Sequence, residues 1–187
     1  MVSALYMWEM IYKGKLVGIE KHISKGFERA VRPPGVRLIL QNGVGEFLLT
    51  KEFRSEQNKI DYRLPGGKVF DDLVSYLAVR TDAPVLEQAV LSAAALEAKQ
   101  EVGVDEVTDL KILTKSVAGA SVEWDLYYLT GVIKSMSEQE LDGDEKQYGI
   151  DVAFYSKDEV LKLLRLGEIS EDRTVGVLFR YFSPSSA

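Results

Sequence analysis

The chain has 187 residues, of which 46% are hydrophobic and 28% charged, and its formal net charge is −6. This balance is typical of one soluble globular domain and excludes a disordered chain, while the acidic charge argues against a nucleic acid or an anionic membrane as partner. With no Cys and a single His, His22, the sequence excludes a disulfide framework, thiolate catalysis and zinc-finger or iron–sulfur ligation. Any bound metal would need oxygen ligands, which favours Mg²⁺, Mn²⁺ or Ca²⁺.

The first half of the chain is rich in strand signals. Two hairpins are predicted around the turn residues Lys13-Gly14-Lys15 and Asn42-Gly43. Their strands are expected at residues 4–12, 15–23, 36–40 and 46–50. Because Arg32-Pro33-Pro34-Gly35 breaks the chain, we expect residues 1–31 to form a small β appendage and residues 32–182 the main domain. A polar connection is expected over residues 54–62.

The second half combines helices and strands. Helices are expected at residues 70–80, 87–102, 156–166 and 171–182. Strands are expected at residues 107–116, 122–133 and 152–155, with a break at 81–84, an acidic loop at 136–149 and a tail at 183–187. Because strands precede the central helix and further helices close the chain, the order predicts an α+β fold in which helices cover a mixed sheet.

The helix expected at residues 87–102 has the clearest pattern. It is rich in good helix formers, and Gly103 follows it where a C-terminal cap belongs. Its apolar stripe is expected to consist of Leu91, Ala94, Ala95, Ala98 and Val102.

Glu97 and Glu101 stand four residues apart on this helix, which places both carboxylates on one face, one turn apart. Like charges at this spacing slightly destabilise a helix, and a divalent cation held by oxygen ligands would remove the repulsion. The spacing alone is equally compatible with a solvated helix face.

Several motifs surround this pair. Gly67, Glu97, Glu101, Gly103 and Val104 match fixed positions of the pattern G-x5-E-x7-R-E-U-x-E-E-x-G-U, in which U is aliphatic. An insertion, which we place at residues 68–87, separates Gly67 from the rest of the pattern. Further matching segments are Leu48–Arg54, Arg63-Leu-Pro-Gly-Gly67, Gly119–Glu123 and Gly167–Thr174. The sequence thus resembles the Nudix hydrolase family, and within it the ADP-ribose and sugar-nucleotide pyrophosphatases, which implies a Nudix-type α/β/α sandwich.

The resemblance implies a metal site for Mg²⁺ or Mn²⁺. Glu97 and Glu101 would be its principal ligands and would be catalytic through the ion, with the main-chain carbonyl of Gly66 as a third ligand. Gln100 stands where the family has a Glu, and an amide oxygen is a weaker, uncharged ligand. Leu96 replaces the family's Arg, so the hydrogen bonds of that Arg to a ligand carboxylate are lost.

The resemblance also suggests catalytic and substrate-binding residues outside the helix. In this branch of the family the general base comes from an acidic loop, for which Glu145 is the first candidate and Glu140 the second. Glu123 could assist from its strand, and Arg54 and Arg63 are candidate phosphate contacts. For each of these residues a solvated loop or a surface salt bridge is the alternative interpretation.

Two functions remain open from the sequence. The first is Mg²⁺-dependent hydrolysis of the pyrophosphate bond of a nucleoside diphosphate derivative, such as ADP-ribose or another nucleotide sugar. The second is a Nudix-fold module that binds a nucleotide with impaired catalysis, which the residues Gln88, Leu96 and Gln100 favour. A small-molecule nucleotide is the expected partner, and the resemblance implies a homodimer. Because no apolar run is long enough to span a membrane and no secretory leader is evident, the expected location is cytoplasmic.

Overall fold

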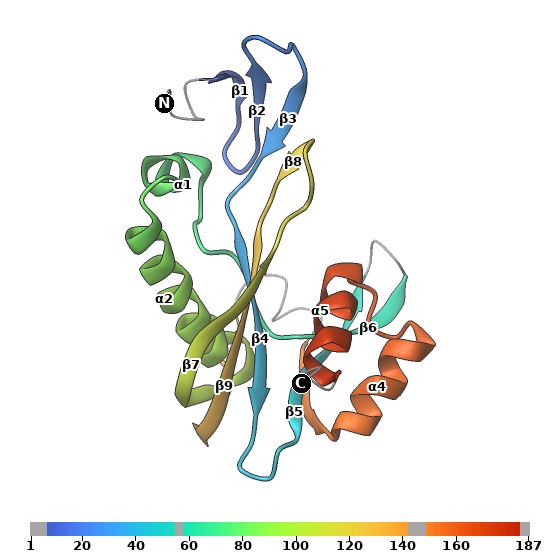
Figure 1. The fold of residues 1–187 in the computed structure, drawn as a ribbon. Helices are drawn as coiled ribbons and strands as arrows, with labels where there is room; N and C mark the ends of the chain where they lie inside the picture. The colour runs from blue at the N-terminus through green and yellow to red at the C-terminus, as the bar shows by residue number, and fades with distance from the viewer. Residues whose placement is uncertain (1–6, 55–57, 142–148, 184–187) are drawn as a thin grey trace.

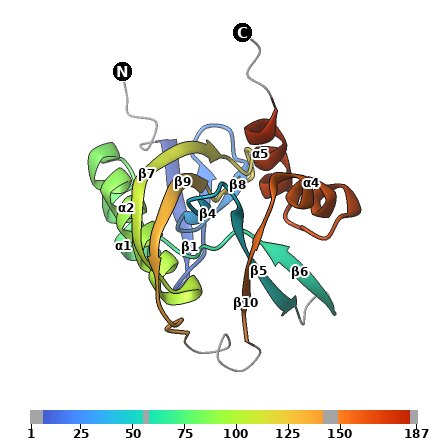
Figure 2. The same cartoon turned by 90° about the horizontal axis from the view of Figure 1, so that it is seen from below.

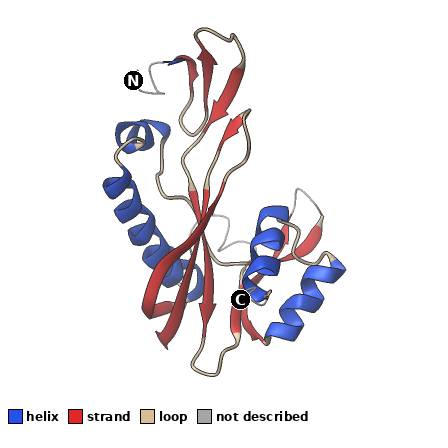
Figure 3. Cartoon of the chain, in the orientation of Figure 1, coloured by secondary structure: helices blue, strands red, loops and turns tan. Residues whose placement is uncertain are grey.

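The structure, a computed structural model, describes residues 7–54, 58–141 and 149–183 (Figure 1). Its strands are β1 (Trp8–Lys13), β2 (Gly18–His22), β3 (Glu28–Val31), β4 (Gly35–Gln41), β5 (Phe47–Arg54), β6 (Lys59–Arg63), β7 (Val104–Ser116), β8 (Val122–Glu123), β9 (Leu126–Met136) and β10 (Asp151–Tyr155). Its helices are α1 (Leu73–Val79), α2 (Ala83–Val102), α4 (Lys157–Leu166) and α5 (Asp172–Phe182). Figure 3 shows the strands running through the middle of the molecule, with helices on either side.

The central sheet lies between two helical layers. Its strand order is β10-β5-β4-β9-β7, and β6 also pairs with β5. β4 and β9 run parallel while β7 and β9 run antiparallel, so the sheet is mixed. Helix α2 covers one face, and α4 and α5 cover the other (Figure 1 and Figure 2). The α+β architecture and the α/β/α layers expected from the sequence are therefore confirmed.

β4 is the buried centre of this sandwich. Alternate residues of a strand point to opposite faces. Val36, Leu38 and Leu40 accordingly pack in the cluster that includes α2, whereas Ile39 packs in the cluster that includes α4 and α5. A strand that is covered on both faces needs apolar residues on both, which accounts for the nearly continuous apolar run that predicted it.

A second, smaller sheet has the order β1-β2-β3-β8. The hairpin expected near residue 14 is confirmed as β1 and β2, although β3 was not expected. The single strand expected at residues 122–133 was wrong, because β8 pairs with β3 in the small sheet and β9 joins the central sheet. The small sheet therefore contains a strand from late in the chain, and the domain boundary at residue 31 stays a prediction.

The expected insertion is helical. α1 confirms the helix predicted at residues 70–80, with the side chain of Asp72 accepting the backbone N–H of Ser75 at its start. α2 begins at Ala83, four residues before the predicted start, because Asp82 caps it and a Pro is tolerated in the first turn. The predicted break at residues 81–84 is correspondingly shorter.

The buried face of α2 also differs slightly from the prediction. Ala94, Ala98 and Val102 are buried as expected, but Val90 is buried in place of Ala95, which is exposed. The predicted Gly103 cap is confirmed: this residue has a φ of 68° and donates its backbone N–H to the carbonyls of Ala98 and Lys99.

Residues 59–63 form β6, although a polar connection was expected there. The side chain of Asp61 is buried and accepts the backbone N–H of Ser170, so a contact distant in sequence stabilises this short strand. The predicted helices at 156–166 and 171–182 are confirmed as α4 and α5. Within the described part of the chain, no helix has the length and apolar character needed to cross a bilayer.

Candidate functional site

The segment Leu64–Gly67 runs beside β4 and is fixed to it by backbone hydrogen bonds. Leu38 N–H donates to the Pro65 carbonyl at 2.8 Å, and Val36 N–H donates to the Gly67 carbonyl at 2.9 Å. Gly66 has a φ of +150°, and a Cβ there would overlap the Val36 carbonyl oxygen. Only glycine therefore allows the chain to pass this close to β4.

The same two glycines contact the carboxylates of α2. Gly66 N–H donates to Glu101 Oε2 at 2.6 Å. A Cβ on Gly67 would overlap the carboxylate of Glu97. The structure thus brings together Gly66, Glu97 and Glu101, and the fourth residue expected at a metal site, Gln100, lines the same pocket.

These residues line a pocket of about 680 Å³, which we call the carboxylate pocket. It is lined by Gly66–Asp71 and by Ala89, Ser92, Ala93, Leu96, Glu97, Gln100, Glu101 and Glu140. The small side chains Ala89, Ser92 and Ala93 leave space along α2 in front of the two carboxylates. Leu96 is 54% exposed and contributes an apolar side chain to the pocket wall.

Glu140, the second candidate base, lies at the edge of the carboxylate pocket. Its backbone N–H donates to the Gln100 carbonyl at 2.9 Å, and its side chain pairs with Lys99 at 3.6 Å. These contacts attach the start of the acidic loop to the end of α2. Glu145, the first candidate base, lies outside the described residues.

The donor set of the carboxylate pocket fits a hard divalent cation. All candidate ligands are oxygens: the carboxylates of Glu97 and Glu101, the Gln100 amide and the Gly66 carbonyl. Among the described residues no group of three His, Cys, Asp or Glu side chains could hold a metal. Two carboxylates suffice for Mg²⁺, because this ion usually takes its remaining ligands from substrate and water.

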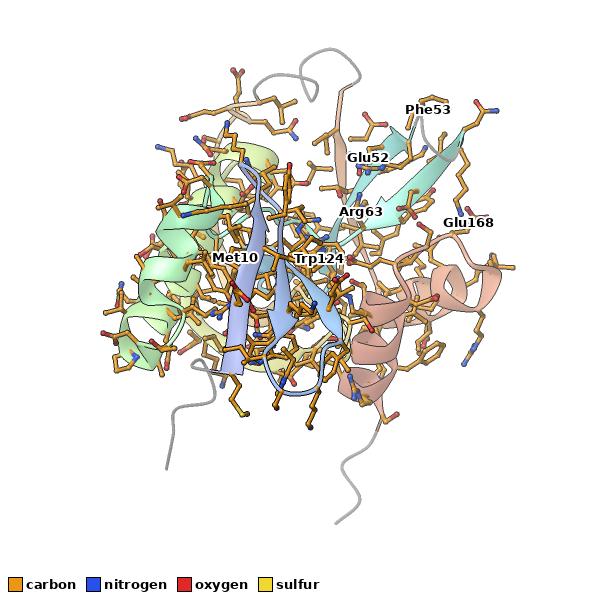
Figure 4. All side chains as sticks on the ribbon, turned by 90° about the horizontal axis from the view of Figure 1, so that it is seen from above. Met10, Glu52, Phe53, Arg63, Trp124 and Glu168 are labelled. Carbon is orange, nitrogen blue, oxygen red and sulfur yellow. The ribbon has the colours of Figure 1, made fainter. Side chains whose placement is uncertain are left out.

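A second pocket of about 310 Å³ adjoins the first and shares with it Gly66, Gly67, Lys68 and Glu101. We call it the guanidinium pocket, because it is lined by Arg32, Arg37, Arg54 and Arg63. Three of the residues that line it are labelled in Figure 4: Trp124 near the centre of the molecule, Glu52 in β5 and Arg63 in β6. The two glycines therefore lie between an acidic and a basic compartment.

Arg54 and Arg63, the expected phosphate contacts, lie together in the guanidinium pocket. Their Nη1 atoms lie 3.1 and 3.0 Å from the same oxygen, Glu52 Oε1. Glu52 was not singled out in the sequence. It neutralises one of the two guanidinium charges and holds both side chains side by side.

Arg37 is a buried residue of the pocket that sequence analysis missed. Its guanidinium forms a bidentate pair with Glu171, with nitrogen–oxygen distances of 2.9 and 3.1 Å. Thr174 Oγ1 donates to the same carboxylate at 2.6 Å. Burial acts to raise the pKa of Glu171, but the hydrogen bonds and charge of Arg37 and the Thr174 hydroxyl outweigh it, so this pKa lies below its ordinary value. The sequence signal that could have identified Arg37 is its position as a charged residue within an otherwise apolar strand.

Glu123 belongs to a different cluster. Its carboxylate accepts the Tyr76 hydroxyl at 2.9 Å and pairs with Arg29 at 3.0 Å and Arg80 at 3.3 Å. Both arginines also pair with the buried Glu20, at 2.8 and 2.9 Å. We call Glu20, Arg29, Arg80 and Glu123 the junction cluster, because it joins the small sheet to the end of α1. The structure does not bring Glu123 into the carboxylate or the guanidinium pocket.

Comparisons with known proteins bear on the fold. No family model and no curated protein matches the sequence. Among solved structures, that of an ADP compounds hydrolase is similar to this chain with a TM-score of 0.61 and 19% sequence identity, and the match covers 92% of this chain and 88% of that one. The chain therefore has the Nudix ADP-ribose pyrophosphatase-like fold that its motifs suggested.

Proposed function

We propose that the chain hydrolyses the pyrophosphate bond of a nucleoside diphosphate derivative, with ADP-ribose or another nucleotide sugar as the substrate class and Mg²⁺ or Mn²⁺ as cofactor. One observation carries the proposal: Gly66 and Gly67 lie in contact with Glu97 and Glu101, at the meeting point of the carboxylate and guanidinium pockets. A pyrophosphate needs both surroundings, because its charge is balanced by a carboxylate-bound cation on one side and by guanidinium groups on the other.

Glu97 and Glu101 would hold the cation, with Gly66 and Gln100 as further oxygen donors. When bound, such an ion neutralises charge that develops on the phosphates and lowers the pKa of a bound water. The hydrogen bond from Gly66 N–H orients the carboxylate of Glu101. The chain thus positions its principal ligand through the backbone, which compensates in part for the hydrogen bonds lost with Leu96.

The other candidate residues would bind the phosphates of the substrate or accept a proton from water. Arg54 and Arg63 would grip phosphate oxygens; both contact Glu52, and Arg63 Nε also lies 4.0 Å from the carboxylate of Asp61. Glu140, at the edge of the carboxylate pocket, and Glu145, in the acidic loop, are the candidates to accept the proton of the attacking water.

A nucleotide-binding module with impaired catalysis is the second candidate function. Leu96 favours it, because an apolar side chain lines the pocket where a hydrogen-bond donor to a ligand carboxylate would assist metal binding. Gln100 favours it as well, because it supplies no charge. We expect fewer or weaker cation sites than in a relative with the complete motif.

The homodimer is also a proposal. The small sheet exposes the apolar side chains of Ile11, Tyr12, Ile23 and Phe27, which are between 43% and 65% accessible. Ile11 and Tyr12 lie in β1, and Ile23 and Phe27 lie between β2 and β3; exposed large apolar side chains are common at protein interfaces. A small-molecule nucleotide stays the expected ligand, and the cytoplasmic location stays a prediction.

The test is an assay of the purified chain with Mg²⁺ and a panel of nucleoside diphosphate sugars, in which phosphatase releases phosphate from the products. Glu101→Gln should lower turnover about 100-fold or more, because it removes a ligand charge but keeps an acceptor for Gly66 N–H. Glu106→Gln, an exposed position on β7, is the matched control and should retain activity. Nucleotide binding without turnover of any compound would favour the binding module instead.

A further inference from the structure

Two guanidinium groups pack against the indole ring of Trp124. The Cζ atoms of Arg32 and Arg173 lie 4.2 and 4.3 Å from the ring centroid. Trp124 and Arg32 line the guanidinium pocket, and Arg173 Nη1 donates to the Trp124 carbonyl at 2.7 Å. We call these three residues the arginine–tryptophan cluster.

The two guanidinium groups of this cluster carry a charge that no carboxylate of the described residues neutralises. Across the described ranges neither Arg32 nor Arg173 pairs with a carboxylate, whereas neighbouring Arg37 pairs with Glu171. Arg32 Nε is buried without a hydrogen-bond partner in the same ranges. The pKa of Arg32 lies below its ordinary value. The main cause is burial, and the charges of Arg173 and Arg37 add to it. Arg32 and Arg173 are partly buried, and a cation withdrawn from water normally acquires an anionic partner, so this arrangement is unfavourable for stability.

The geometry leaves the cluster able to bind an anion. A guanidinium that stacks on an indole uses its flat face, and its N–H donors point outward in the plane of the group. Arg32 lines the same pocket as Gly66, Gly67 and Glu101. A ligand whose pyrophosphate lies at the glycines can therefore extend toward Arg32 within one continuous space.

We propose that the arginine–tryptophan cluster binds a further oxyanion, a phosphate monoester or a carboxylate, that the ligand carries outside its pyrophosphate. The inference rests on the proposed function and narrows its substrate class. The preferred nucleotide derivative carries more negative charge than ADP-ribose, and Arg32 is the residue that selects it.

Equilibrium binding of two matched pairs of compounds tests this inference. NADP⁺ differs from NAD⁺ by one phosphate monoester, and UDP-glucuronic acid differs from UDP-glucose by one carboxylate. Titrations with Ca²⁺ in place of Mg²⁺ keep a hard cation at the carboxylates, and analysis of the products after each titration checks that no compound has been hydrolysed. Because the chain has only two Trp residues, Trp8→Phe leaves Trp124 as the only indole whose fluorescence reports binding.

We expect the more anionic member of at least one pair to bind about tenfold more tightly, as one charge-assisted contact would produce. The pair that shows the difference identifies phosphate or carboxylate as the oxyanion. Arg32→Gln should abolish the difference, because the more anionic compound then loses its additional charge-assisted contact. Arg165→Gln, an exposed position on α4 with the same change in charge, should preserve it.

Equal affinities within both pairs would overturn the inference. It would also be overturned if Arg32→Gln lowered the unfolding temperature without changing selectivity, because that result indicates a structural role. The two proposals fail separately: turnover that is lost in Glu101→Gln without any anion preference refutes only the inference. Anion preference without turnover of any compound refutes only the hydrolase.

Discussion

Two groups of arginines lie on opposite sides of two adjacent residues, Glu123 and Trp124. In the junction cluster Arg29 and Arg80 are paired with two carboxylates, Glu20 and Glu123. In the arginine–tryptophan cluster the guanidinium groups of Arg32 and Arg173 contact an indole, and no carboxylate of the described chain pairs with them. The first arrangement balances its charges within the protein, as a structural contact requires, whereas the second retains a positive charge that suits a ligand.

The residue of this region that lines the guanidinium pocket is Trp124, one position after Glu123. Glu123, in the segment 119–123, was expected to assist at the site, but it lies in the junction cluster. Adjacent residues of an extended chain point in opposite directions. Trp124 consequently reaches the guanidinium pocket while Glu123 does not.

Removing one carboxylate from the junction cluster should have the largest effect on stability. Glu20→Gln should lower the free energy of unfolding by about 3 kcal/mol, because Arg29 and Arg80 would then share Glu123 alone in a buried site. Urea denaturation of this variant and of Glu9→Gln, an exposed position in β1, gives the measurement and its control. A loss below about 1 kcal/mol, the range of exposed ion pairs, would contradict a structural role for the cluster.

Glu171→Gln should lower the free energy of unfolding by about 2 kcal/mol at neutral pH, because Arg37 loses its charged partner. Since the pKa of Glu171 is lower in the folded chain than its ordinary value near 4.5, its contribution is complete above that value and is lost as the pH falls through the folded pKa. Thermal unfolding from pH 7 downward should therefore show the two proteins converging in stability. A constant difference across the acidic range would refute this assignment.

Tyr76→Phe should lower the free energy of unfolding by about 1 kcal/mol, because it removes one hydrogen bond to Glu123 and preserves the ring. Its ring is buried beside Leu73 and Val31, so packing is unchanged. Chemical denaturation against the wild type measures the difference. An unchanged midpoint would show that the two arginines alone determine the position of Glu123.

The smallest effect is expected for Arg32→Gln. Its free energy of unfolding should stay within about 0.5 kcal/mol of the wild-type value or rise slightly. The variant removes a charge that lies near other cations without a carboxylate partner. Arg80→Gln is the direct comparison, because Arg80 pairs with two carboxylates and its loss should be clearly destabilising. Equal losses in the two variants would abolish the distinction between the clusters.

Local patterns predicted much of the fold and the pair of glutamates that lines the carboxylate pocket. The apolar run of β4, the Gly103 cap and the i, i+4 spacing of Glu97 and Glu101 are signals within a few residues of sequence, and the structure confirms each of them. The capping box of α4, in which Ser156 and Glu159 bond reciprocally, is equally local.

Features that depend on distant contacts were not predicted. β6 is stabilised by the contact of Asp61 with Ser170, and the division of residues 122–133 depends on the pairing of β8 with β3. Trp124 and Arg173 meet only after the central sheet and α5 are assembled. Periodicity and turn chemistry carry no information about such pairs, because neither partner marks the other in the sequence.

The parallel pairing of Ala30 in β3 with Val122 in β8 has a consequence for synthesis on the ribosome. β3 emerges about ninety residues before its partner, so at typical elongation rates it waits roughly 5 to 20 s with an unpaired edge. Exposed strand edges invite pairing with other chains, and charged residues such as Glu28 and Arg29 discourage it. The end of the protein that is translated first is thus expected to complete its folding only after most of the chain has been made.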